Sequence, residues 1–135
     1  MYRNILVPVL LDKDHDTASA YAVARALAED DARYHVIHVM ETLPAYATAQ
    51  IPHDLIDHSR QDAMEQTKAS ASALPGAEVH LVTGHAGAAI LNYAEEHGCD
   101  CIVVASHRPG MQDFLLGSTA ARVVRHAKCA VHVIR

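Results

Sequence analysis

The chain has 135 residues, 50% of them hydrophobic and 20% charged, which is the composition of one globular domain covering residues 1–135. Its formal net charge of -5 at pH 7 argues against a basic surface that binds nucleic acid, and no apolar run reaches the roughly 18 residues of a membrane span. We therefore expect neither a nucleic-acid nor a membrane partner. Three cysteines, an odd number without a secretory leader, are typical of free thiols in a cytoplasmic protein.

Strand-like and helix-like segments alternate along the whole chain. The first strand-like segment, "NILVPV", is a near-continuous apolar run, and Asp16 or Thr17 can cap the helix that follows. The predicted strands are 3–9, 34–40, 77–83, 101–105 and 130–135, and the predicted helices are 17–28, 53–74, 86–97 and 118–127. The inward-facing residues expected in the last helix are Ala120, Val123, Val124 and Ala127.

This alternation predicts an α/β fold: a doubly wound, five-stranded parallel sheet with helices on both faces and the strand order 3-2-1-4-5. In that order the first and fourth strands are neighbours, and the direction of winding reverses between them. Ligands bind to such sheets in the crevice outside the carboxyl ends of those two strands. The loops that begin at Val9 and at Ser106 are therefore the expected walls of a binding site.

The segment "ASHRPGMQDFLLGSTAARVV" combines a polar loop with the start of a helix. Gly117 lets a ligand approach the backbone closely, and the unpaired amides of a first helical turn favour an anion. The residues that we expect around a phosphate are Ser106, His107, Arg108, Gly117, Ser118 and Thr119. The alternative is that Ser118 only caps the helix and that Arg108 is solvated.

Other catalytic and metal-binding patterns are missing from the sequence. Neither GxxxxGK[ST] nor GxGxxG is present, which excludes a P-loop NTPase and the dinucleotide-binding fingerprint. The eleven histidines lack the spacing of a tetrahedral metal site, and we expect most of them at the surface or at strand edges. Cys101 opens a buried strand and is expected to be structural. No catalytic residue is assigned, since Asp113, the only acid inside the loop, is expected to be solvated rather than bound to Mg²⁺.

Several segments resemble the universal stress protein family along the full length of the chain. "NILVPV" and "HVIHVM" resemble its first two strands, and "TGHAGAAIL" is similar to its turn into the third helix. The most specific match is "IVVASHRPGMQDFLLGSTAARVVRHAKCAVHVIR", which resembles the tail of the shorter F/G-type branch. The resemblance implies an adenine nucleotide α-hydrolase-like fold and a stress-response function that depends on ATP, AMP or ADP, with or without Mg²⁺.

The resemblance also implies where the nucleotide lies. The family motif G-x-x-G, nine residues, G-[ST] has Ala105 and Arg108 in place of its first two glycines, and it is one residue shorter here. The implied base is bordered by residues at the end of the first strand and in the second, and the implied ribose by a glycine after the third. The full implied set is Pro8, Val9, Val39, Gly84, Ala105, Ser106, His107, Arg108, Gly117, Ser118 and Thr119.

Two further implications concern selectivity and assembly. The family usually has an aspartate directly after the first strand, where this chain has Leu10, which weakens the expected selectivity for adenine unless Asp12 or Asp14 reaches in. The resemblance implies a homodimer, or a homotetramer, joined through the final strand from Ala130 to Arg135. An apolar edge strand without proline independently favours pairing with a second strand.

Together these observations predict a cytoplasmic universal stress protein that binds an adenine nucleotide between the first and fourth strands. We expect a regulatory dimer and not an efficient enzyme. Two alternatives stay open. In one, His107 and Asp113 are the acid and base of a slow nucleotide hydrolase. In the other, the protein is a nucleotide-free dimeric adaptor whose crevice holds a small anion, which would agree with Leu10.

Overall fold

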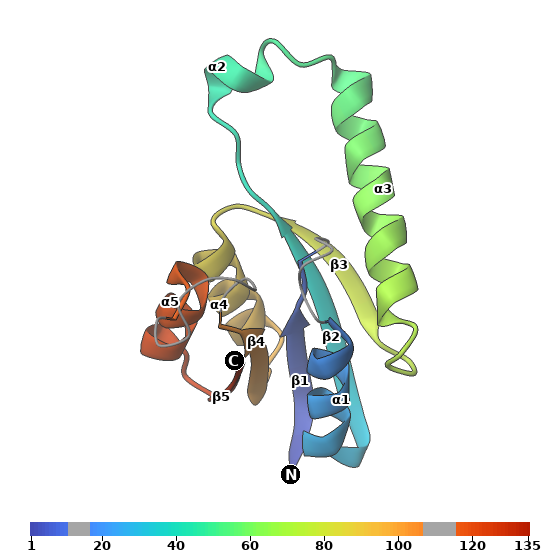
Figure 1. Ribbon diagram of the computed structural model, residues 1–135, viewed down its shortest axis with the longest axis vertical. Helices are drawn as coiled ribbons and strands as arrows, with labels where there is room; N and C mark the ends of the chain where they lie inside the picture. The colour runs from blue at the N-terminus through green and yellow to red at the C-terminus, as the bar shows by residue number, and fades with distance from the viewer. Residues whose placement is uncertain (11–16, 107–115) are drawn as a thin grey trace.

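The computed structural model describes residues 1–10, 17–106 and 116–135. Five parallel strands form one sheet in the order β3-β2-β1-β4-β5, which confirms the predicted fold class and strand order (Figure 1). The strands are β1 Tyr2–Pro8, β2 Ala28–Met40, β3 Glu78–Thr83, β4 Cys101–Ala105 and β5 Ala130–Ile134.

Helices cover both faces of this sheet. They are α1 Thr17–Leu27, α2 Ala45–Thr48, α3 His53–Ala71, α4 Ala86–Glu96 and α5 Ser118–His126. One face is covered by α1 and by the C-terminal part of α3, where the hydroxyl groups of Tyr21 and Ser70 share a 2.6 Å hydrogen bond. The other face is covered by α4 and α5, which lie side by side (Figure 1). None of the helices within the described ranges is long and apolar enough to cross a membrane.

Two apolar clusters, one on each face, hold the layers together. In β1, Ile5 and Val7 point toward α1, whereas Leu6 between them points toward α4 and α5. In β4, Val103 and Ile102 divide between the two clusters in the same way. Successive side chains of a strand point to opposite faces, so a central strand covered on both faces must be apolar at every position. This is why the near-continuous apolar runs predicted buried parallel strands.

The second strand is longer than predicted, because β2 begins at Ala28 and not at residue 34. Tyr2 pairs with Ala28, but the next pair is Asn4 with Arg33, so β2 carries a bulge between them. The side chain of Arg3 spans this bulge, with Nε donating to Oε2 of Glu29 over 2.8 Å. Most of the extra residues, 28–33, are charged, and none of them is buried. A segment that pairs only through its backbone, with no regular spacing of apolar residues, cannot be identified as a strand from the sequence.

The long connection after β2 contains the short helix α2 and leads into α3. Pro44 and Pro52 occupy the positions directly before these two helices, where the missing amide hydrogen of a proline costs nothing. The buried residues of α3 are Ala63, Thr67 and Ala71, all in its second half. The first half of α3 extends past the carboxyl ends of the strands, together with α2 (Figure 1).

The prediction that Val124 of the last helix belongs to the core is wrong. Ala120 and Val123 are buried under α5, but the side chain of Val124 is 46% exposed. Successive helical residues are about 100° apart, and the buried stripe of α5 is only wide enough for Ala120, Val123 and the partly buried Ala127.

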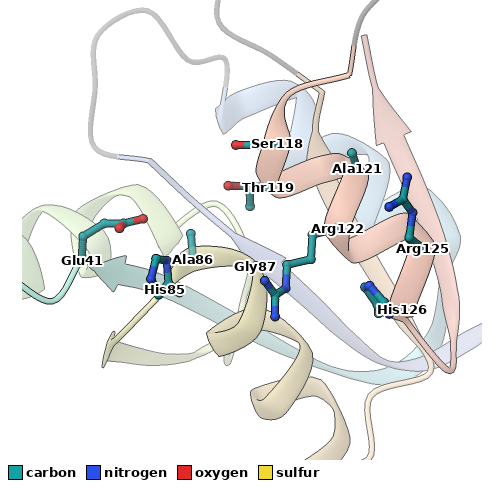
Figure 2. Close-up of a pocket in the computed structure, with 10 residues that line it drawn as sticks. All are labelled: Glu41, His85, Ala86, Gly87, Ser118, Thr119, Ala121, Arg122, Arg125 and His126. Carbon is teal, nitrogen blue, oxygen red and sulfur yellow. The ribbon is translucent and has the colours of Figure 1, made fainter.

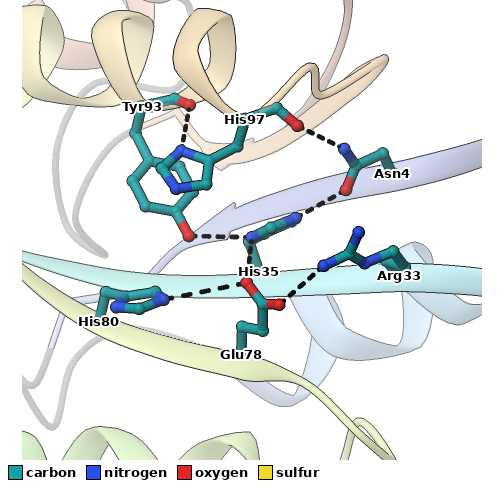
Figure 3. A network of polar contacts seen from close by, with 7 residues as sticks. All are labelled: Asn4, Arg33, His35, Glu78, His80, Tyr93 and His97. Carbon is teal, nitrogen blue, oxygen red and sulfur yellow. Dashed lines mark hydrogen bonds and ion pairs between the residues drawn. The ribbon is translucent and has the colours of Figure 1, made fainter.

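A closed polar network lies at the amino ends of β1 and β3 and beside the middle of β2 (Figure 3). At its centre lies His35, which is 1% exposed and is the only buried histidine among the described residues; most of the others are exposed, as predicted. Its Nε2 lies 2.7 Å from Oδ1 of Asn4, and its Nδ1 lies 2.9 Å from the hydroxyl of Tyr93 and 3.3 Å from Oε2 of Glu78. The guanidinium of Arg33 holds Glu78 from the other side over 2.8 Å.

The direction of these hydrogen bonds fixes the tautomer of His35. The amide nitrogen of Asn4 donates to the carbonyl of His97, so its oxygen faces His35 and accepts from Nε2–H. In the neutral imidazole, Nδ1 then accepts from the hydroxyl of Tyr93. Burial lowers the pKa of His35, and the opposing attraction of Glu78 is weaker, so the folded protein favours this neutral form. Burial also raises the pKa of Tyr93 to about 12, which keeps its hydroxyl proton in place.

Candidate ligand-binding site

An apolar cavity opens at the carboxyl ends of β1, β2 and β4, at the predicted reversal of winding between β1 and β4. Its volume is about 160 Å³. Aliphatic side chains and small residues make up most of its wall, while Glu41 contributes the only carboxylate among the described residues that line it. The lining residues are Pro8, Val9, Leu10, Thr17, Ala20, Val39, Glu41, Ala86, Ile90, Val104, Ala105 and Thr119.

A second, more polar cavity of about 560 Å³ continues from the first along the space between α4 and α5 (Figure 2). We call it the α4–α5 groove. It is lined by Glu41, His85, Ala86, Gly87, Ser118, Thr119, Ala121, Arg122, Arg125 and His126. Glu41, Ala86 and Thr119 line both cavities, so the groove and the apolar cavity meet at these three residues.

The amino end of α5 lies where the two cavities meet. Gly117 is the residue before the first helical turn, and no side chain of the described residues caps that turn with a hydrogen bond. The alternative role of Ser118 as only the helix cap is therefore wrong, because Gly117 holds the cap position and Ser118 is the first residue inside the helix. In Figure 2 the hydroxyl groups of Ser118 and Thr119 point into the space facing Glu41. Uncapped amides and two hydroxyl donors make this turn suited to an anion.

The two ends of the loop between β4 and α5 are joined. The amide of Gly117 donates to the carbonyl of Ser106, and the amide of Ser106 donates to the carbonyl of Ile134 over 2.8 Å. Ser106 is 2% exposed, so its backbone anchors the loop inside the protein beside β5. The start of α5 is thereby held at the end of β4, next to the apolar cavity.

The structure brings most of the predicted site residues to this place. Pro8, Val9, Val39, Ala105 and Thr119 line the apolar cavity, and Ser118 and Thr119 line the groove. Ser106 and Gly117 lie together at the base of the loop. Gly84 is the exception among the described residues, since it follows β3 with a φ of 143° and lines neither cavity. His107, Arg108 and Asp113 lie outside the described residues, as do Asp12 and Asp14.

Sequence reasoning missed several residues that line these cavities. Glu41 directly follows β2, and parallel strands end at the same edge of the sheet, so its position after a strand was the available signal. The basic residues Arg122 and Arg125 carried no such signal, because they face the groove only through the packing of α5 on α4. His85 precedes α4 and was interpreted only as part of a tight turn.

The charges around the site are uneven. Leu10 lines the apolar cavity and is 46% exposed, so the carboxylate usual after the first strand of the family is missing there. Glu41 supplies a carboxylate from the neighbouring strand instead. Two guanidinium groups and two imidazoles lie in the groove, against this single acid.

The cysteines do not contribute a reactive group to this site. Cys101 is the first residue of β4, at the opposite end of the sheet, and burial raises the pKa of its thiol to about 11. Burial likewise raises the pKa of Cys99 to about 12. Both thiols therefore stay protonated, which agrees with the structural role predicted for Cys101.

The fold and the site together define a class: an α/β protein with a doubly wound parallel sheet and a cavity at the carboxyl ends of its strands. The model of the universal stress protein family matches residues 1–135, and the chain belongs to this family. Universal stress protein G of Escherichia coli O157:H7 is 30% identical over 142 residues, covering 100% of both chains, which confirms the resemblance to the F/G-type branch. Universal stress protein A homolog 2 of Coxiella burnetii is 34% identical over 140 residues, covering 99% of this chain and 95% of its own.

Solved structures of the family agree with the fold. Universal stress protein UspA from Lactobacillus plantarum superimposes with a TM-score of 0.73 at 30% identity, covering 99% of this chain and 98% of its own. A universal stress protein from Archaeoglobus fulgidus in complex with dAMP gives 0.68 at 18% identity, covering 99% and 98%. A family member from Arabidopsis thaliana with AMP bound gives 0.63 at 20% identity, covering 98% and 90%.

Proposed function

We propose that the crevice between β1 and β4 binds an adenine nucleotide and that the protein acts in the stress response by binding it. The observation that carries this proposal is the pairing of an apolar cavity with an uncapped helix start that shares Thr119 with it. A planar base needs an apolar slot, and a phosphate needs amide donors a short distance away. Family members that bind AMP and dAMP support adenine as the base.

The base lies among Val9, Val39, Ile90 and Val104 in this proposal, because these aliphatic side chains form the body of the apolar cavity. The ribose then lies near Ala105, and the first phosphate lies over the first turn of α5. This turn offers its backbone amides with the hydroxyls of Ser118 and Thr119. His107 and Arg108 remain proposed phosphate contacts on the sequence evidence alone.

Glu41 takes the role of the acid that position 10 lacks. Its carboxylate can accept a hydrogen bond from the exocyclic amino group of adenine or from a ribose hydroxyl, and Leu10 cannot. A site that presents an acceptor to adenine discriminates against guanine, which has a carbonyl at the corresponding ring position.

In this proposal the functional form is a dimer, and each chain contributes one domain. The dimer acts in the cytoplasm. Among the described strands, β5 is at the edge of the sheet and pairs with β4 alone, so its outer edge can accept a strand from a second copy. The nucleotide is ATP, ADP or AMP, with Mg²⁺ accompanying the longer phosphate chains. Sedimentation of the purified chain would contradict the dimer if it gave the mass of one chain at micromolar concentration.

Calorimetric titration with AMP, ADP and ATP, the latter with and without Mg²⁺, tests nucleotide binding. We expect saturable binding to the native protein, and an affinity at least about tenfold weaker in Ala86→Leu, whose side chain would fill the junction of the two cavities. Ala69→Leu is the matched control, since Ala69 is an exposed residue of α3 remote from both cavities. The absence of any binding at millimolar nucleotide would favour the adaptor, and phosphate release well above background would favour the hydrolase.

A further inference from the structure

The far end of the α4–α5 groove is basic. Arg122 and Arg125 follow one another at a helical spacing of three along α5, and His126 lies beside them. His85, the residue that precedes α4, lies at the other end of the groove, beside Ala86 and Glu41 (Figure 2). Glu41 is the only acid among the described residues of the groove, and it lies at the junction with the apolar cavity.

The two guanidinium groups in the groove differ from three basic side chains elsewhere in the described chain, which form ion pairs. Arg3 is held by Glu29 at 2.8 Å, Arg33 by Glu78 at 2.8 Å, and Lys128 by Glu95 at 2.9 Å. Within residues 1–10, 17–106 and 116–135, no carboxylate lies within ion-pair distance of Arg122 or Arg125. Their charges are therefore available to a ligand that enters the groove.

Gly87 positions one of these arginines. The stem of Arg122 lies directly on α4 at this glycine, and a methyl group at position 87 would come within 2.7 Å of Cδ and 3.2 Å of Cβ of Arg122. Figure 2 shows the guanidinium of Arg122 lying over Gly87, inside the groove. The missing side chain at position 87 thus lets Arg122 lie along the floor of the groove, where its head group faces a ligand.

We propose that the α4–α5 groove is a subsite for a polyphosphate chain that continues beyond the phosphate next to adenosine. This inference rests on the proposed nucleotide site, because the groove begins at Thr119, Ala86 and Glu41, where that site ends. The chain would run along α5 from Thr119 toward His126. Arginine binds phosphate oxygens in a bidentate manner, and Arg122 and Arg125 offer two such groups to different parts of an extended chain.

Two sources can supply this chemistry. One is a dinucleoside polyphosphate, whose first adenosine occupies the apolar cavity while its phosphate bridge and second nucleoside follow the groove. The other is free inorganic polyphosphate, which binds the groove beside a mononucleotide. The groove volume of about 560 Å³ exceeds the roughly 160 Å³ of the apolar cavity, so it has room for a large second group.

Calorimetric titrations of the full chain with AMP, with diadenosine tetraphosphate and with inorganic tripolyphosphate test this subsite. For Arg122→Ala and Arg125→Ala, we expect the affinity for the two polyphosphate probes, relative to that for AMP, to fall about tenfold. Gly87→Ala should act in the same direction, because the new methyl group displaces Arg122. The matched control is Arg25→Ala, which removes an exposed arginine of the last turn of α1, remote from the groove.

The outcomes separate the two proposals. If the native protein binds diadenosine tetraphosphate more tightly than AMP, and the groove variants lose this difference, the result supports the subsite with a dinucleoside ligand. Tripolyphosphate that binds together with AMP and is lost in the variants supports the subsite with a free chain. If AMP binds but neither polyphosphate probe distinguishes the groove variants from Arg25→Ala, the subsite is overturned and the nucleotide site stands. Tripolyphosphate binding that depends on Arg122, without binding of AMP, would support the basic groove and overturn the nucleotide site.

Discussion

The two ends of the sheet use the same kinds of side chain in opposite ways. At the amino ends of the strands, His35 is enclosed by Asn4, Tyr93 and Glu78, and Arg33 closes the network from outside (Figure 3). At the carboxyl ends, histidines and arginines line open cavities (Figure 2), and no side chain of the described residues caps α4 or α5.

This difference separates residues that maintain the fold from residues that can bind a ligand. A buried polar group is tolerated only when its hydrogen bonds are complete, and a complete network has no capacity left for a ligand. Unpaired cations around a cavity contribute little to the fold, and a ligand can complete their interactions. The amino ends should therefore determine stability, and the carboxyl ends should determine binding.

The largest expected effect on stability is that of removing the centre of the closed network. We expect His35→Ala to lower the free energy of unfolding by about 2–4 kcal/mol, because it leaves buried hydrogen-bonding groups of Asn4 and Tyr93 without a partner and opens a cavity. Urea denaturation measures this loss. His58→Ala, at an exposed position of α3, is the control and should change stability by less than about 0.5 kcal/mol. Equal effects of the two variants would contradict the structural role of the network.

An intermediate effect is expected from pH. Because burial lowers the pKa of folded His35, the unfolded chain binds a proton at a higher pH than the folded protein does. The contribution of His35 is complete above the unfolded pKa of about 6.5, and it is lost as the pH falls from there toward the lowered folded pKa. The slope for one proton is at most about 1.4 kcal/mol per pH unit.

Other groups titrate in the same range, so the pH dependence is best measured as a difference. Unfolding free energies of the native protein and of His35→Gln, between pH 7.5 and 5, isolate the contribution of this imidazole. We expect the native protein to lose its advantage over the variant as the pH decreases. A difference that stays constant or grows on acidification would show that His35 is not held neutral in the fold.

The smallest expected effect on stability belongs to the open end. We expect Arg125→Ala to change the free energy of unfolding by less than about 0.5 kcal/mol, because Arg125 is exposed and its guanidinium has no ion-pair partner among the described residues. Thermal and urea unfolding in the absence of ligand measure this change. A loss of more than about 1 kcal/mol would mean that Arg125 supports the packing of α5 and would remove the contrast between the two ends.

The sequence alone determined the architecture of this protein. Apolar runs such as "NILVPV" and "CIVVA" alternate with amphipathic segments, and this local pattern fixes a parallel sheet covered on both faces. Connections between parallel strands are short and right-handed, and this favours the observed strand order. The strand order in turn sets the position of the crevice. Val9, Val39 and Thr119 could therefore be assigned to the site through the family resemblance before their positions were known, and they line the apolar cavity.

Only the tertiary structure decided which individual side chains meet. His35 and Tyr93 are 58 positions apart, and whether a strand histidine is solvated or enclosed depends on the helix that packs over it. Arg122 faces a groove because Gly87, on a different helix, leaves room for its stem. Val124 is exposed although its type and spacing resemble those of Val123. Periodicity is a property of neighbouring residues along the chain, whereas burial and pairing depend on contacts between distant segments, which no local pattern encodes.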